Sequence, residues 1–243
     1  MEINNRIIVA LDFSSKAEVE KFLAKFDLSK KDSLRFVKLG MELYYAEGPS
    51  MIEFLKDLGL QVFLDLKIHD IPNTAYGAIK SLARYGVDIV NVHASGGIEM
   101  MKRAKDALVD ANSTAKLIAV TQLTSTDQKT MNEELGIVGS VEDAVLRLAM
   151  NTKTAGLDGI VCSPLEVPLI KQKLGKGFIT VCPGIRLTDN NTDDQKRITT
   201  PEQAFKHGSD YIVMGRAITE ETKPALVFNA ICSRLQNINY PIC

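Results

Sequence analysis

Eight short apolar runs recur along the chain, and each is followed by a segment with helical periodicity. The runs are rich in β-branched residues and continuously apolar, as expected for parallel strands that are covered on both faces. The predicted strands are 7–11, 36–39, 62–66, 89–92, 117–120, 160–162, 178–182 and 211–214. The predicted helices are 16–26, 50–58, 74–85, 98–111, 141–155, 164–174, 201–206 and 219–235.

Eight strand-then-helix units predict an α/β protein with the (β/α)8 architecture of a TIM barrel. We expect residues 1–243 to form a single domain, since no linker or low-complexity tract interrupts the series. A doubly wound open sheet is the competing fold. That fold usually shows a glycine-rich turn after its first strand, whereas residues 11–15 contain no glycine.

Composition narrows the choice of partners. The 243 residues are 45% hydrophobic and carry a net charge of -1, so no global field favours nucleic acid or an anionic membrane. No apolar run approaches the roughly 20 residues that a membrane-spanning helix needs. Residues 1–6 lack the features of a signal peptide, so the expected location is cytoplasmic. The four cysteines have no metal-binding spacing and are expected to be buried thiols.

The stretch 62–74 gathers charges where a buried strand gives way to a loop. Asp65 and Lys67 are two positions apart, so on a strand they project to the same side. Asp70 follows beyond the expected strand end, and Asn73 or Thr74 is predicted to cap the next helix. A catalytic role is favoured over a structural ion-pair network, because charged surface pairs rarely collect at the end of a buried strand.

The carboxyl ends of barrel strands point into one site. The residues at or just past the ends of the predicted strands are Asp12, Lys38, Asp65 with Lys67, His93, Thr121 to Thr124, Ser163, Pro183 to Arg186, and Gly215 with Arg216. His93 is interpreted as a buried hydrogen-bonding group. No metal site is expected, because the two lysines interleaved with the carboxylates of Asp12, Asp65 and Asp70 would repel a divalent cation.

The last two strand ends predict an anion site. Gly184 precedes Arg186 and Gly215 precedes Arg216, each pair just past a strand. Glycine lets backbone N–H groups approach a phosphate, and arginine adds a forked positive charge. Turn glycines beside surface arginines are the alternative. The polar segment 187–198 is long for a barrel connection and is predicted to be a lid.

The segment 65–74, Asp-Leu-Lys-Ile-His-Asp-Ile-Pro-Asn-Thr, closely resembles the signature of the orotidine 5'-phosphate decarboxylase family, bacterial type. Five further motifs fall in the expected order: Ala10-Leu11-Asp12, Val37-Lys38-Leu39-Gly40, Thr121-Gln122-Leu123-Thr124-Ser125, Pro183-Gly184-Ile185-Arg186 and Val213-Met214-Gly215-Arg216. The resemblance implies a homodimeric barrel that converts orotidine 5'-phosphate to UMP, the last step of de novo pyrimidine synthesis, with no cofactor.

The resemblance also implies roles for individual residues. Lys67 would protonate the carbanion within a charge array of Lys38, Asp65, Lys67 and Asp70. Asp70, Ile71 and Thr74 would reach the partner subunit's site. The substrate-binding set would be Asp12 and Lys38 at the ribose, Thr124 at the base, Ile71 and Thr74, and Pro183, Arg186, Gln195, Gly215 and Arg216 at or around the phosphate.

Two other functions remain open on the sequence. One is a magnesium-dependent sugar-phosphate decarboxylase or aldolase of the same superfamily, although Lys38 stands where those relatives typically carry an acidic metal ligand. The other is a catalytically silent nucleotide-binding barrel that acts as a sensor.

Overall fold

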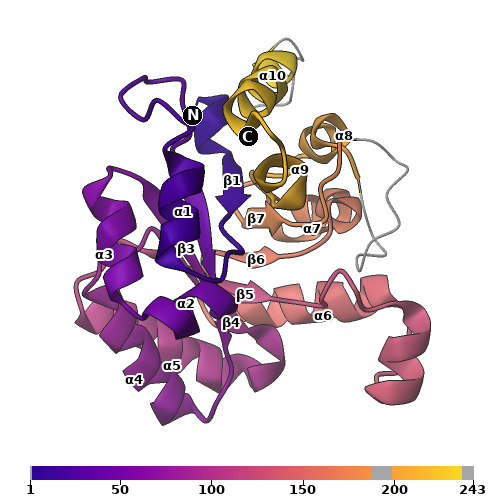
Figure 1. Ribbon diagram of the computed structural model, residues 1–243. Coiled ribbons are helices and arrows are strands. Elements are labelled where there is room, and N and C mark those ends of the chain that lie inside the picture. The colour runs from indigo at the N-terminus through magenta and orange to yellow at the C-terminus, as the bar shows by residue number, and fades with distance from the viewer. Residues whose placement is uncertain (1, 188–198, 237–243) are drawn as a thin grey trace.

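Eight parallel strands close into a barrel in chain order, so that β8 pairs with β1 (Figure 1). This computed structural model describes residues 2–187 and 199–236. The strands are β1 (Ile7–Ala10), β2 (Phe36–Gly40), β3 (Gln61–Ile68), β4 (Ile89–His93), β5 (Lys116–Val120), β6 (Gly159–Val161), β7 (Ile179–Cys182) and β8 (Tyr211–Met214). The predicted (β/α)8 barrel is therefore confirmed.

Helices surround the barrel on its outer face (Figure 1). They are α1 (Lys16–Leu23), α2 (Met41–Glu47), α3 (Ser50–Asp57), α4 (Pro72–Ala83), α5 (Gly97–Asp110), α6 (Val141–Thr154), α7 (Val167–Leu174), α8 (Pro201–Lys206), α9 (Arg216–Thr219) and α10 (Pro224–Gln236). Short helical turns are η1 (Ile3–Asn5), η2 (Ala94–Gly96), the π-helical η3 (Thr130–Glu134) and η4 (Pro164–Glu166).

Three details of the helices differ from the sequence prediction. Helix α2 was not predicted, and the single helix predicted over 219–235 is two helices, α9 and α10. Helix α4 begins at Pro72 with Ile71 at its N-cap and no side-chain cap, so the prediction that Asn73 or Thr74 caps this helix is wrong. Proline at the first helical position has no N–H that needs a cap, which explains the difference.

The interior of the barrel has an apolar floor and a polar layer above it. Ile8, Phe36, Phe63 and Ile89 belong to one cluster inside the barrel, while the residues beside them in the strands pack outward against the helices. Because side chains alternate along a strand, residues two positions further on face the interior again, one layer nearer the carboxyl ends. In β2, β3 and β4 this second layer is Lys38, Asp65 and Asn91, whereas β1 contributes Ala10 and Asp12 follows just after that strand.

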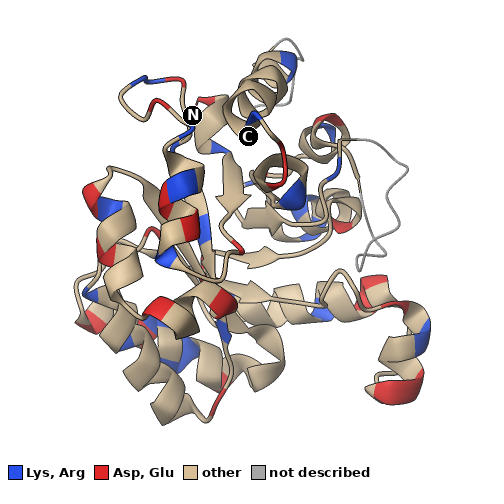
Figure 2. Ribbon diagram, viewed as in Figure 1, with Lys and Arg blue, Asp and Glu red and all other residues tan. Residues whose placement is uncertain are grey.

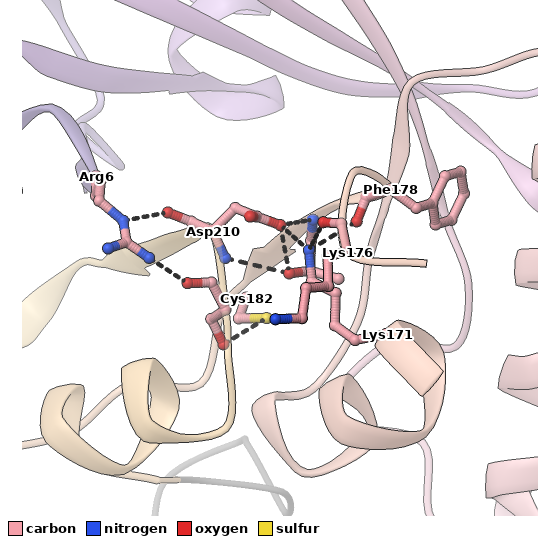
Figure 3. Close-up of polar contacts among 8 residues, drawn as sticks. Arg6, Lys171, Lys176, Phe178, Cys182 and Asp210 are labelled. Carbon is pink, nitrogen blue, oxygen red and sulfur yellow. Dashed lines mark hydrogen bonds and ion pairs between the residues drawn. The ribbon is translucent and has the colours of Figure 1, made fainter. Parts of the chain in front are cut away.

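The amino ends of the strands are held by a carboxylate at Asp210, immediately before β8 (Figure 3). Its Oδ2 accepts hydrogen bonds from Lys171 Nζ at 2.6 Å, from the Thr180 backbone N–H at 2.7 Å and from the Thr180 hydroxyl at 2.9 Å. The Arg6 guanidinium donates to the backbone carbonyls of Asp210 and Ser209, at 3.0 and 2.8 Å. These contacts join α7, β7 and β8 and close the barrel onto β1.

The same arrangement occurs before β4 and β6. Asp88 Oδ2 accepts from Lys56 Nζ at 2.7 Å and from the Val62 N–H at 2.8 Å. Asp158 Oδ2 accepts from Lys105 Nζ at 2.7 Å and from the Leu117 N–H at 2.8 Å. We call Asp88, Asp158 and Asp210 the aspartate anchors. Each one ties the start of an odd-numbered strand, and the helix before it, to the start of the next strand.

The surface carries both signs of charge, interspersed over the helices (Figure 2). No helix in the described part of the chain is long and apolar enough to cross a membrane. Cys162, Cys182 and Cys232 are buried free thiols, as predicted, while Cys243 lies outside the described residues.

Candidate active site

A cavity of about 860 Å³ opens at the carboxyl ends of the strands. Its volume falls within the range of roughly 300–1,000 Å³ that is typical of small-molecule sites. Most of the predicted site residues line it: Asp12, Lys38, Asp65, Lys67, Thr124, Pro183, Arg186, Gly215 and Arg216. The barrel therefore brings together residues that are spread over more than 200 positions of sequence.

Four charged side chains form a continuous row along one wall of the cavity. Lys38 Nζ lies 2.8 Å from Asp12 Oδ1 and 3.5 Å from Asp65 Oδ2. Asp65 Oδ1 in turn lies 2.8 Å from Lys67 Nζ. The signs alternate along the row, so each ammonium group has a carboxylate beside it. Asp65 and Lys67 are on the same side of β3, as their spacing predicts.

Burial and neighbouring charges shift the pKa values of Asp65 and Lys38 in opposite directions. Burial alone would raise the pKa of Asp65, but the ammonium groups of Lys38 and Lys67, with a hydrogen bond from Asn91, lower the pKa of this carboxyl below its ordinary value. Burial alone would lower the pKa of Lys38, but Asp65 and Asp12 raise it above its ordinary value. Both groups are therefore charged at neutral pH.

The backbone at Lys67 departs from ordinary strand geometry. Its φ is +50°, in the left-handed region that residues other than glycine rarely adopt. The pairing of β3 with β4 shifts at the same place, between Leu64 opposite Val90 and Ile68 opposite Val92. Bulges of this kind re-aim side chains and are common beside active sites.

The ends of β7 and β8, which follow β1 around the closed barrel, carry the predicted anion-binding residues. Gly184 has a φ of +81°, a conformation that favours glycine, and Arg186 is buried. The Arg186 N–H donates to the Thr199 carbonyl, and the Thr199 N–H donates to the Gly184 carbonyl, both at 3.0 Å. These bonds join the two ends of the segment predicted to be a lid. Its residues 188–198, Gln195 among them, lie outside the described residues.

Three predicted site residues lie elsewhere on the surface of the chain. Asp70, Ile71 and Thr74 are exposed and do not line the cavity. They follow β3 and begin α4, next to a second hollow of about 430 Å³ whose lining includes Tyr45 and His69. Ile71 and Tyr45 are 67% and 73% exposed, so large side chains with apolar surface face solvent in this region.

His93 is half-buried and has the hydrogen-bonding role that the sequence suggested. Its Nδ1 lies 2.7 Å from the Ser95 hydroxyl, and its ring stacks on His69 with centroids 5.6 Å apart. Burial lowers the pKa of His93, and His69 and Lys67 lower it further.

Some residues of the site were not predicted from the sequence. Phe13 and Glu220 line the cavity but fall in no motif, whereas Gln122 and Ser125 line it from a predicted motif in which neither had been given a role. Asn91 was missed too, although it is a polar residue inside an otherwise apolar strand, which was a usable signal. Within the described ranges, no group of three or more His, Cys, Asp or Glu side chains is placed to hold a metal ion.

Comparison with known proteins gives a consistent result. A family model described as "Orotidine 5'-phosphate decarboxylase / HUMPS family" matches residues 5–231. The orotidine 5'-phosphate decarboxylase of Staphylococcus saprophyticus is 50% identical over 229 residues, covering 94% of this chain and 97% of that protein. The enzyme of the same name from Bacillus cereus strain Q1 is 47% identical over 240 residues, covering 97% and 99%.

Solved structures agree with the sequence matches. Orotidine 5'-phosphate decarboxylase from Lactobacillus acidophilus superposes with a TM-score of 0.84 at 39% identity, covering 96% of this chain and 99% of that one. An uncharacterized conserved protein from Geobacillus kaustophilus gives a TM-score of 0.82 at 44% identity, covering 94% and 99%.

Proposed function

The chain belongs to the orotidine 5'-phosphate decarboxylase family and is a carboxy-lyase of pyrimidine biosynthesis, and we propose that it works without metal or organic cofactor, with Lys67 as the proton donor. The observation that supports this mechanism best is the row of alternating charges from Asp12 to Lys67 along the cavity wall. The Staphylococcus saprophyticus and Bacillus cereus relatives, at 50% and 47% identity, both carry the decarboxylase name, which favours this activity over the aldolase and sensor alternatives.

In the proposed step, the bond between the pyrimidine ring and its carboxylate breaks and carbon dioxide leaves. The electron pair stays on the ring carbon, which has no easy route for delocalising it. The Lys67 ammonium transfers a proton to that carbon, forming UMP. One positive charge about 4 Å from the developing carbanion, at an effective dielectric near 20, contributes on the order of 4 kcal/mol. Enzymes as a class lower barriers by roughly 8–23 kcal/mol, so other groups must contribute as well.

Asp65 supports this role by accepting the Lys67 hydrogen bond. Because neighbouring cations lower the pKa of Asp65, it stays ionised and can hold the ammonium in one orientation before substrate arrives. A charge that is already oriented in a shielded site needs no reorganisation at the moment of reaction. Lys38, bonded to both Asp12 and Asp65, extends the same array.

The rest of the cavity would bind the remainder of the nucleotide. We assign Asp12 and Lys38 to the ribose hydroxyls and Thr124 to the base. Pro183, Arg186, Gly215 and Arg216, with Gln195, would lie at or around the phosphate. Binding energy from the phosphate, remote from the reacting carbon, can be used to organise the site around the pyrimidine.

We further propose that the enzyme is a cytoplasmic homodimer whose partner completes each site. Asp70, Ile71 and Thr74 are exposed and lie outside their own chain's cavity, which is consistent with a contribution to the other subunit. A second copy would also cover the exposed Ile71 and Tyr45. We treat each chain as one domain, since strands from residues 7 to 214 close a single barrel.

The test is Lys67→Ala. We expect turnover of orotidine 5'-phosphate to fall by at least about 10³-fold, since removing one preorganised donor commonly costs about 10²–10³ and here the proton is lost as well. UMP binding should remain measurable. Lys153→Ala, at an exposed lysine of α6, is the control and should be fully active. Near-normal turnover by Lys67→Ala would refute the proton-donor role, and loss of wild-type activity with EDTA would refute metal independence.

A further inference from the structure

Asn91 is the central residue of β4, and its side chain is fully buried. It occupies the second interior layer of the barrel, two positions beyond Ile89 of the apolar floor. A buried amide costs free energy unless its polar atoms are hydrogen-bonded. Its partners therefore show why this position is polar.

Both ends of the Asn91 amide contact the reacting segment of β3. Its Oδ1 accepts the backbone N–H of Lys67 at 2.8 Å, and its Nδ2 donates to Asp65 Oδ1 at 2.7 Å. That same Asp65 oxygen accepts the Lys67 ammonium at 2.8 Å. Asn91 thus holds Lys67 twice, directly through the backbone and indirectly through the carboxylate that orients its side chain.

The backbone contact occurs where the strand geometry is strained. Lys67 has a φ of +50°, and the register of β3 against β4 shifts around it. A conformation of this kind persists only where the surroundings specify it. The Asn91 oxygen supplies a partner for a backbone N–H in the shifted part of the ladder, and this stabilises the shifted conformation.

The chemistry at this position requires asparagine. The Lys67 N–H can only donate and an ionised Asp65 can only accept, so the side chain between them must offer one acceptor and one donor. Aspartate has the same shape but would point an oxygen at the Asp65 carboxylate. Leucine has a similar volume but satisfies neither partner.

We propose that Asn91 is a positioning residue of the decarboxylase: it fixes the left-handed backbone of Lys67 and the orientation of Asp65, and so aims the ammonium into the cavity. The inference rests on the proton-donor role proposed for Lys67. Asn91 does not line the cavity, so its removal is expected to act on the chemical step and to leave the groups assigned to phosphate and ribose in place.

The experiment compares Asn91→Ala with Asn4→Ala. Asn4 is also buried and also donates its amide to two groups, the Lys31 and Ser33 carbonyls, but it lies in η1 at the other end of the barrel. A displacement of about 1 Å at a reacting group can cost about 10²-fold in rate. We expect Asn91→Ala to lower kcat by tenfold or more, with KM and UMP affinity within threefold of wild type. Asn4→Ala should keep kcat within twofold.

Two further variants keep the test decisive. Asn91→Asp should lose at least as much kcat as Asn91→Ala, because it lacks the donor and adds a negative charge. If Asn91→Ala does not fold, Asn91→Ser is judged by the same tenfold criterion. A kcat loss of less than tenfold, a loss confined to KM, or an equal loss in Asn4→Ala overturns the positioning role. An active Lys67→Ala would instead refute the proton-donor role, and this inference with it.

Discussion

The aspartate anchors allow a quantitative prediction about stability. In Asp210→Asn the shape of the side chain is kept, but its charge is removed from beside the Lys171 ammonium. Asp210 and Lys171 are 23% and 10% exposed, so the ammonium would be left largely buried without a counter-charge, held only by neutral acceptors such as the Lys176 and Phe178 carbonyls. All three donors share one oxygen, Oδ2, so an amide oxygen in its place could still accept from them, but without the negative charge that strengthens these bonds.

The size of the effect follows from these contacts. Hydrogen bonds to charged groups contribute about 1.5–3 kcal/mol each, and breaking a fully buried ion pair costs about 3–5 kcal/mol. Because this pair is partly exposed and uncharged hydrogen bonds to the amide oxygen can survive, we expect the free energy of unfolding to fall by about 2–3 kcal/mol. For a chain of this length that corresponds to a decrease in Tm of roughly 5–10 °C.

The assay is urea unfolding at fixed protein concentration, with kcat measured at 25 °C. Asp106→Asn is the control, because Asp106 pairs with Arg103 at 3.1 Å on the surface, where the two side chains are 55% and 38% exposed. That change should cost about 0.5 kcal/mol or less. The kcat of Asp210→Asn should be unchanged, since the anchor lies at the opposite end of the barrel from the cavity. A loss below about 1 kcal/mol, or one equal to the control's, would refute the reasoning.

Three other predictions concern the site. Arg216→Ala should reduce kcat/KM for orotidine 5'-phosphate at least tenfold more than for orotidine, which lacks the phosphate; equal losses in a kinetic assay would remove Arg216 from the anion site. Mixing inactive Asp70→Ala and Lys67→Ala chains should restore activity if subunits share sites, whereas inactive mixtures shown by mass spectrometry to contain heterodimers would contradict sharing. Gly40→Ala would place a methyl group 2.9 Å from Lys38 Nζ and should lower kcat/KM about tenfold with little change in Tm, because only a flexible side-chain end must move; wild-type kinetics would argue against this crowding.

Much of the fold could be predicted from the sequence because its signals are local. The eight apolar runs specify buried parallel strands, and the spacing of Asp65 and Lys67 places both on one side of β3. Helix α2 was missed because no loop separates it from β2: Gly40 is both the last residue of the strand and the N-cap of the helix. The true start of α4 was missed because Pro72, rather than a side-chain cap, begins that helix.

The register between neighbouring strands could not be predicted from the sequence. The shift of β3 against β4 depends on the pairing of both strands, so the left-handed backbone of Lys67 has no local signature. For the same reason Asn91 could be recognised as unusual but not assigned a partner. The roles of Asp70, Ile71 and Thr74 depend on a second chain, and they remain predictions.

The position of the aspartate anchors has a consequence for how this enzyme can diverge. They lie before the strands begin, whereas the cavity residues lie where the strands end, so the residues that stabilise the scaffold and those that set the chemistry occupy opposite ends of the barrel. Loops at the open end of the barrel can be exchanged or lengthened while the anchors and their lysines stay untouched. A library randomised in those loops should therefore contain mostly folded proteins, which makes this barrel a suitable starting point for selecting new substrates.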